Sequence, residues 1–328
     1  MSKRIALPLA AAALLSLIAA APRPVRRHSF LPANTLMHQL GAHENSGITE
    51  AQFNAVMDRM QALYGPIVSA HGATLVINRL WTDATVNASA EEQDGHWILN
   101  MYGGLARDKA ITQDGMALVA CHEMGHHLGG APKYDGGSNW AANEGEADYF
   151  ASSKCLHLFF GDAATASFTR PNLASGDIPA EACGKSYKDE KDVAVCVRSA
   201  IAGQSVTALF TELSGDPIAR LDTPDKSVVK QTNDEHPASQ CRLDTYYQAA
   251  LCTKDFNIAM SPTDPAVGGC VASQGYTSGM RPRCWYAPAA GELNGEQNVT
   301  SASMEKQSHA AASSVLASLK NTNVFSGL

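Results

Sequence analysis

The chain has 328 residues, a formal net charge of -7 and an aromatic content of 7%. This length is sufficient to bury a sizeable core in one large or two small domains. An acidic chain with few aromatic residues argues against a nucleic-acid partner, because contact with phosphates requires clustered basic side chains.

The N-terminus has the features of a secretory signal peptide. Lys3 and Arg4 precede an apolar, alanine-rich run from Ile5 to Ala21. The run contains Pro8 and is short for a membrane span, so we expect cleavage after residue 21 rather than an uncleaved anchor. We find no later segment apolar enough to cross a bilayer. These features predict a soluble, exported protein, periplasmic or secreted, with no stable membrane span after cleavage.

Residues 22–47 contain several prolines and are expected to be irregular. Thr49 is a candidate N-cap for a helix whose apolar residues recur at helical spacing until Gly72. Alternating and β-branched residues then predict three strands, the last two joined by a turn at Asp94-Gly95. The predicted strands cover residues 74–81, 85–90 and 96–102.

An apolar run predicts the next helix, over residues 112–128, and the run leads into His122-Glu123-x-x-His126. Two histidines four residues apart lie on one helix face and can bind the same zinc ion. Glu123 can hold and deprotonate a zinc-bound water. Gly129 and Pro132 then end the helix.

The third zinc ligand is expected on a helix over residues 143–160. The metzincin pattern HExxHxxGxxH takes its third ligand from a later histidine of the same segment, but Pro132 stands at that position. Glu144 and Asp148, one turn apart on one face, are similar to the gluzincin pattern, in which a ligand Glu is followed four residues later by an Asp. This similarity implies Glu144 as the ligand and Asp148 as an acceptor that orients one histidine ring. Glu146 is the competing ligand, although it points to another side of the helix.

The C-terminal half is less regular. We expect helices over residues 191–213 and 242–252, loop-like chain over 168–186, and an irregular, cysteine-rich region over 261–290. Residues 291–328 are low in complexity and predict a mobile tail, weakly helical near 310–319. The predicted domains are therefore a signal peptide (1–21), one catalytic domain (22–290) and the tail.

The eight cysteines suit an oxidising compartment. Six of them form pairs that are close in sequence, and we expect these local pairs to be bridged. Cys121 and Cys155 would remain, either as a bridge between the two metal-binding helices or as two buried thiols. The expected local pairs are Cys183 with Cys196, Cys241 with Cys252, and Cys270 with Cys284.

In its motifs the chain resembles the zinc peptidases that include HtpX and the CAAX prenyl protease, which have a gluzincin-type catalytic domain. The similar segments are Val86 to Ala90, Asp94-Gly95, Met101 to Leu105, Asp114 to His126, Glu144 to Asp148, and His236-Pro237. The membrane spans of HtpX and the prenyl protease have no counterpart. The chain is therefore more similar to soluble, exported members of the family.

The resemblance implies an α+β, zincin-like domain with a small mixed sheet, an active-site helix, a second metal-ligand helix and a disulfide-rich C-terminal region. It implies an endopeptidase that hydrolyses polypeptide substrates with one Zn²⁺ and with Glu123 as general base. A zinc-stabilised chaperone-like or scaffold protein of the cell envelope is the alternative. Oligomeric state is not indicated by the sequence.

Two further elements follow from the resemblance. The strand containing Asn87 and Ala88 would lie beside the cleft, where its edge could pair with an extended substrate. Asn87 is equally compatible with a turn at a strand end. His236 could donate a hydrogen bond to the oxyanion, occupy the open zinc position, or be a plain loop residue.

Overall fold

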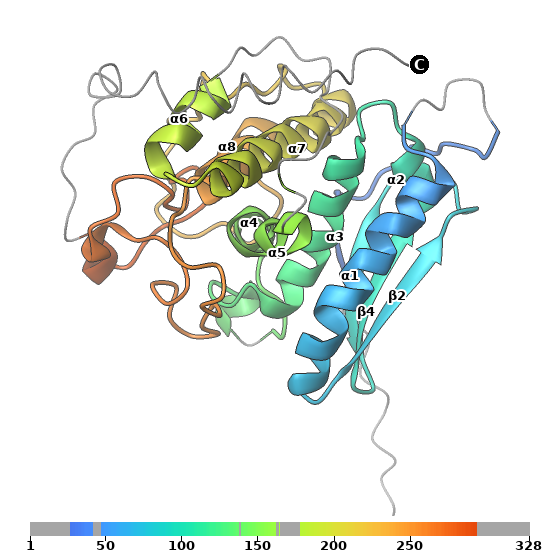
Figure 1. The fold of residues 1–328 in the computed structure, drawn as a ribbon, viewed down its shortest axis with the longest axis horizontal. Helices are drawn as coiled ribbons and strands as arrows, with labels where there is room; N and C mark the ends of the chain where they lie inside the picture. The colour runs from blue at the N-terminus through green and yellow to red at the C-terminus, as the bar shows by residue number, and fades with distance from the viewer. Residues whose placement is uncertain (1–26, 42–46, 138, 162–163, 165–177, 294–328) are drawn as a thin grey trace, which may run out of the picture.

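The computed structural model describes residues 27–41, 47–137, 139–161, 164 and 178–293. The predicted signal peptide and the predicted tail from residue 294 onward lie outside the described residues. Within the described ranges the chain is a mixed α+β protein with a four-stranded sheet. Helix α3 (Gln113–Leu128) lies between this sheet and the helices that follow it in the chain (Figure 1).

Helix α1 (Glu50–Ala70) begins where its capping residue predicts. The Thr49 side chain accepts a hydrogen bond from the Gln52 amide, and the Gln52 side chain accepts one from the Thr49 amide. This reciprocal capping satisfies amides that the first helical turn leaves without partners. One face of α1 is buried against the sheet and α3, and its residues are Phe53, Val56, Met57, Met60, Tyr64 and Val68.

The sheet contains the three predicted strands, β2 (Thr74–Leu80), β3 (Ala88–Gln93) and β4 (His96–Tyr102). A fourth strand, β1 (Arg27–Ser29), was not predicted. The order is β1-β3-β4-β2; β3 runs antiparallel to β1 and β4, and β4 runs parallel to β2. Segment 27–29 carries only polar side chains, so it has no strand pattern and is extended through its pairing with β3.

Helix α2 (Gly103–Arg107) connects the sheet to α3. Helix α3 is buried on all sides from Asp114 to His126. Thr112 caps it by accepting a hydrogen bond from the Gly115 amide at 3.0 Å. Asp114 forms two hydrogen bonds, at 2.8 and 2.9 Å, with Arg198 of helix α7 (Glu190–Ser214), which fixes the start of α3 against this helix.

The predicted helix 143–160 is present as three continuous parts. Helix α4 (Glu144–Phe150) and helix α5 (Leu156–Phe160) are joined by a π-helical turn, Ala151–Cys155. Asn143 caps α4 by accepting from the Glu146 amide at 3.0 Å. A 3-10 turn, Tyr134–Gly137, precedes α4. The π turn ends at Cys155, which is bridged to Cys121 of α3.

The remaining helices are α6 (Ile178–Ser186), α7 (Glu190–Ser214) and α8 (Ser239–Ala250), followed by 3-10 turns at Ala272–Gln274 and Ala290–Glu292. The loop expected over 168–186 is therefore wrong where the structure describes it, since residues 178–186 form α6. Pro179 falls in the first turn of this helix, where proline is tolerated.

Helix α7 is long and apolar enough, by length and composition, to cross a membrane. The expectation that no segment after the N-terminus has this property is therefore wrong. In the structure 94% of the apolar window of α7 is buried inside the protein. Its apolar residues thus contribute to the core.

All eight cysteines are bridged: Cys121–Cys155, Cys183–Cys196, Cys241–Cys284 and Cys252–Cys270. The expected pairs Cys241–Cys252 and Cys270–Cys284 are wrong. Cys241 is the third residue of α8 and Cys252 lies two residues after its end, and the helix from residue 241 to residue 250 alone spans about 14 Å. A disulfide requires Cα atoms less than about 7 Å apart, so these two neighbours in sequence cannot pair.

Candidate metal centre

Three buried side chains converge between α3 and α4. His122 and His126 lie one turn apart on α3, and Glu144 is the first residue of α4. One ligand atom of each residue lies within 4.8 Å of the others. All three side chains are 0% exposed. The two helices therefore form a possible metal-binding cluster from residues that the sequence predicted.

Hydrogen bonds at the far nitrogens orient both histidine rings. His122 Nδ1 lies 2.7 Å from Asp148 Oδ1, and His126 Nδ1 lies 2.9 Å from the Ala142 carbonyl oxygen. Both acceptors require the hydrogen on Nδ1, which leaves Nε2 as the ligand atom. Neither Nε2 atom, nor Glu144 Oε2, has a hydrogen-bond partner among the described residues.

Asp148 is held by more than the histidine. Arg242 of α8 donates to both Asp148 oxygens, at 2.7 and 2.8 Å, and the Tyr246 hydroxyl donates to Oδ1 at 2.5 Å. Burial is the largest single effect and raises the Asp148 pKa, but the charges and hydrogen bonds of Arg242 and His122 together outweigh it and lower that pKa. Asp148 thus stays ionised and can fix the ring of His122.

Glu144 is surrounded by the Tyr134 hydroxyl and by histidine rings. The Tyr134 hydroxyl donates to its Oε1 at 2.6 Å, and His236 Nε2 lies 3.4 Å from its Oε2. Burial opposes ionisation, but His236 and the two cluster histidines outweigh it and hold the Glu144 pKa well below its usual range. The cluster therefore offers two imidazole nitrogens and one carboxylate, a donor set that zinc favours.

The competing carboxylate, Glu146, is used elsewhere. It makes two hydrogen bonds with Arg281, at 2.5 and 2.7 Å, on the opposite side of α4. A second group of possible ligands, Asp225 with Cys241 and Cys284, offers no thiolate because these cysteines are bridged to each other. Glu144 is therefore the carboxylate that joins the histidine pair.

Glu123 lies directly after His122 and is also 0% exposed. Neither of its carboxylate oxygens has a hydrogen-bond partner among the described residues. Burial raises its pKa to about 8, although the neighbouring His122 opposes the shift. Burial also opposes a charge on His122, but Asp148 and Glu144 outweigh it and raise that pKa to about 9. A carboxyl group with a pKa near neutrality can both accept and return a proton.

His236, in the loop before α8, lies at the cluster as predicted. Its Nε2 is 2.7 Å from the Ser29 carbonyl oxygen, and a carbonyl can only accept, so Nε2 carries the hydrogen. A nitrogen that carries hydrogen cannot bind a metal. This contact favours a role in binding a carbonyl oxygen over a role as a ligand.

Asn87 immediately precedes β3, and its side chain bonds to another segment of the chain. Its side chain accepts from the Leu31 amide at 3.0 Å and donates to the Leu31 carbonyl at 3.2 Å. The Ala88 carbonyl accepts from the Phe30 amide at 3.1 Å. The edge of β3 that was expected to face a substrate is thus paired with the chain's own segment 27–31.

Sequence reasoning missed Arg242, Tyr134 and Tyr246, each of which contacts a carboxylate of the cluster. None of them belongs to a motif: Arg242 and Tyr246 lie one turn apart on α8, and Tyr134 lies in the 3-10 turn before α4. The ring of His127, next to His126 in the chain, is stacked between Trp97 and Trp140, at 4.9 and 4.6 Å.

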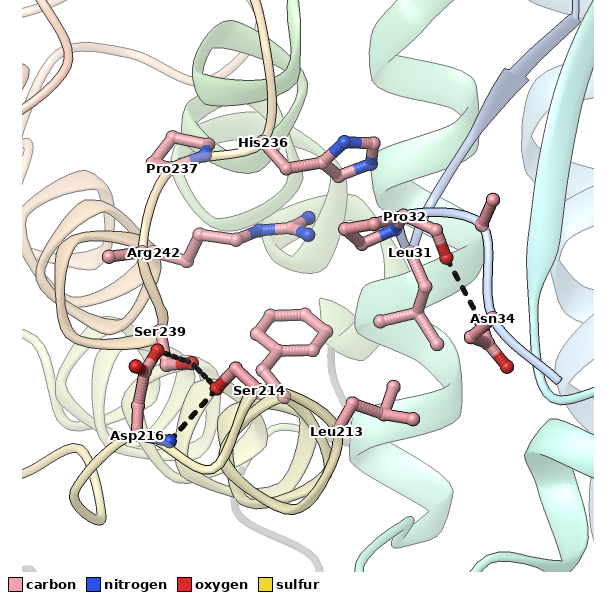
Figure 2. A pocket seen from close by; sticks show the side chains of 13 residues that line it. Leu31, Pro32, Asn34, Leu213, Ser214, Asp216, His236, Pro237, Ser239 and Arg242 are labelled. Atoms are coloured by element: carbon pink, nitrogen blue, oxygen red, sulfur yellow. Dashed lines mark hydrogen bonds between the residues drawn. The ribbon is translucent and has the colours of Figure 1, made fainter. Parts of the chain in front are cut away.

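A pocket of about 340 Å³ adjoins the cluster, between segment 31–34 and the facing ends of α7 and α8. Figure 2 shows His236 and Arg242 extending toward Leu31 and Pro32 across it. Comparison of the chain with protein-family models, curated proteins and solved structures gives no match.

Proposed function

We propose that this chain is an exported zinc-dependent endopeptidase with a zincin-like catalytic domain. One observation carries the proposal: the Nε2 atoms of His122 and His126 and the carboxylate of Glu144 converge in a buried place beside the unpartnered carboxylate of Glu123. Buried polar atoms normally have partners, and so many unsatisfied atoms in one place indicate a missing ligand.

The three protein ligands favour catalysis over a structural metal. Structural zinc sites are normally closed by four protein ligands, whereas catalytic sites leave one position for water or substrate. A structural site also has no use for Glu123, whose buried and unpartnered carboxylate is costly to the fold. The scaffold or chaperone alternative explains neither feature.

A zinc ion, when bound, polarises the substrate carbonyl and acidifies a water molecule. Glu123 accepts the proton of the attacking water and later delivers it to the leaving amine. Asp148 and the Ala142 carbonyl hold the two histidine rings in the tautomer that ligation requires. His236 donates from Nε2 to the carbonyl oxygen, where negative charge develops in the transition state.

The compartment and the family belong to the same proposal. Four disulfides suit an oxidising, extracytoplasmic compartment, which supports periplasmic location or secretion. The relationship to the HtpX and CAAX prenyl protease family rests on the sequence motifs alone. Polypeptides are the proposed substrates.

The test combines zinc analysis with casein cleavage for the wild type and for Glu123→Gln. Gln has the shape of Glu but cannot accept the proton, so the variant should keep one zinc per chain and lose activity by roughly 10²–10⁴-fold. Glu92→Gln is the control, since it makes the same change at an exposed position of β3 outside the cluster and should leave activity unchanged. Normal turnover by Glu123→Gln would remove Glu123 from the mechanism.

A further inference from the structure

Segment Arg27–Leu31 crosses the candidate site as an extended strand. Residues 27–29 pair antiparallel with β3, with Ser29 opposite Ser89, and the Phe30 amide continues the pairing by donating to the Ala88 carbonyl. Extended pairing with the edge of a sheet is a common way in which proteins hold peptide ligands. The segment therefore has the backbone conformation of a bound peptide.

Three successive residues of the segment have their carbonyl groups bound by site residues. His236 Nε2 donates to the Ser29 oxygen at 2.7 Å, and Arg242 Nη1 donates to the Phe30 oxygen at 2.7 Å. The Asn87 side chain satisfies the next residue at both its amide and its carbonyl. The same His236 nitrogen lies 3.4 Å from Glu144 Oε2, so the Ser29 carbonyl is the one adjacent to the metal-ligand cluster.

The side chains on either side of Ser29 contact the two histidine ligands. The His28 ring lies 5.4 Å from the His126 ring and is stacked on Tyr134 at 4.3 Å. The Phe30 ring lies 5.0 Å from the His122 ring. Ser29 is therefore placed between residues that pack directly on the cluster.

Phe30 is 0% exposed and fills a recess between aromatic rings and the Arg242 guanidinium. Its ring lies 5.2 Å from the Phe210 ring of α7, and the Arg242 guanidinium lies over it at 4.8 Å. A bulky apolar side chain in such a recess anchors the segment, because its burial removes a large apolar area from water.

We propose that segment Arg27–Leu31 is an internal peptide bound in the register of a substrate, with the Ser29–Phe30 bond at the reactive position. The inference rests on the proposed peptidase function. It implies that the site accepts extended peptides with a large apolar residue on the amine side of the cleaved bond. It also implies that the segment must leave before another peptide can bind.

The reaction at this position balances as a hydrolysis. The oxygen of one water bonds to the carbonyl carbon that corresponds to Ser29, and the bond to the nitrogen that corresponds to Phe30 breaks. Both water protons pass to the leaving nitrogen, the first through Glu123, so that the amine leaves as an ammonium group and the carbonyl carbon becomes a carboxylate. The pocket beside Leu31–Asn34 (Figure 2) has room for residues that follow on the amine side.

A binding assay tests the inference without turnover. The probe is a fluorescein-labelled peptide with the sequence of residues 25–34, measured by anisotropy against the full chain carrying Glu123→Gln. Adding Phe30→Ala removes the anchor of the internal segment. The apparent affinity for the probe should rise roughly tenfold or more, because it scales with the fraction of chains whose site is open. Phe53→Ala, a buried core change away from the site, is the control and should give no rise.

A second variant guards against loss of the fold by Phe30→Ala. Arg27 is 56% exposed and pairs with Glu91 at 2.5 Å, so Arg27→Glu loosens the segment from the surface. Probe affinity should rise roughly threefold, the scale of a surface ion pair. Arg79→Glu reverses the charge of another surface pair, with Asp58, and should change nothing.

A probe with Ala in place of Phe30 should bind at least roughly tenfold more weakly, because it loses the apolar area that the buried ring removes from water. With Glu123 restored, mass spectrometry should find the unaltered probe cut between its Ser and Phe. Zinc-dependent casein cleavage without any gain of probe binding in Phe30→Ala and Arg27→Glu would overturn this inference and leave the proposed function intact. Gain of binding without zinc or hydrolysis would instead overturn the proposed function.

Discussion

Asp148 provides a sharp test of how the cluster is built, because Asp148→Asn keeps the shape and removes the charge. The side chain is 0% exposed and receives hydrogen bonds from His122, Tyr246 and both sides of the Arg242 fork. The change leaves the buried Arg242 without its counter-charge, which should cost about 3–5 kcal/mol of unfolding free energy. It also places the NH2 group of the new Asn against the groups that donate hydrogen bonds to Asp148.

The same change should weaken zinc binding. Loss of the acceptor that orients a ligand histidine typically lowers metal affinity by roughly 10–100-fold. The unfolding free energy is measured with urea in the presence of a chelator, so that metal binding does not contribute. Zinc affinity is measured by competition with a chromogenic chelator.

Glu146→Gln is the matched control, on the same helix. Glu146 is equally buried and equally paired, with Arg281, but does not contact the cluster. Burial raises its pKa to about 7, so both variants are compared at pH 8, where the carboxylate is ionised. Both should lose similar stability, and only Asp148→Asn should lose zinc affinity. Equal zinc affinity in the two variants would refute the proposed role of Asp148.

Three further predictions concern acid stability, the disulfides and the third ligand. Burial, with a smaller effect of Lys154, lowers the pKa of His157 to about 4, below the value of about 6.5 expected when unfolded. The unfolded state therefore binds more protons between these two pH values. Between pH 7 and pH 4 the unfolding free energy of wild type, measured with urea, should fall by about 3 kcal/mol more than that of His157→Phe. Parallel plots of unfolding free energy against pH for the two proteins would contradict this. Replacing Cys121 and Cys155 by Ala should cost about 4 kcal/mol and lower zinc affinity, whereas replacing Cys183 and Cys196 should cost about 3 kcal/mol and leave zinc affinity unchanged in the same two assays. Glu144→Ala should sharply reduce zinc content by elemental analysis while Glu146→Ala should not, and equal losses would show that the wrong carboxylate was chosen.

The residues of the cluster could be predicted because local periodicity places them. His122 and His126 are one turn apart on a strongly apolar helix, and Glu144 and Asp148 are one turn apart on the next. Helical spacing determines which side chains share a face, whatever the rest of the fold. Spacing within each helix does not predict that the two helices come together. The resemblance of Glu144 and Asp148 to the gluzincin pattern predicted it.

Other parts of the site depend on contacts between distant segments. β1 consists of Arg27, His28 and Ser29, which have no alternation of apolar and polar residues, and they become a strand through β3. Arg242 reaches Asp148 from a helix far along the chain, and no spacing relates the two residues. The pairing of Cys241 and Cys252 could have been rejected from sequence, because the helix predicted over 242–252 already holds them apart.

The central claim is that His122, His126 and Glu144 together bind one zinc ion. Anomalous diffraction at the zinc absorption edge tests it most directly in crystals of the full chain. We expect a single peak about 2.0–2.2 Å from His122 Nε2, His126 Nε2 and a Glu144 carboxylate oxygen. A zinc peak elsewhere would contradict the account. So would a fully occupied zinc site in which Glu146 or His236, and not Glu144, is the third ligand.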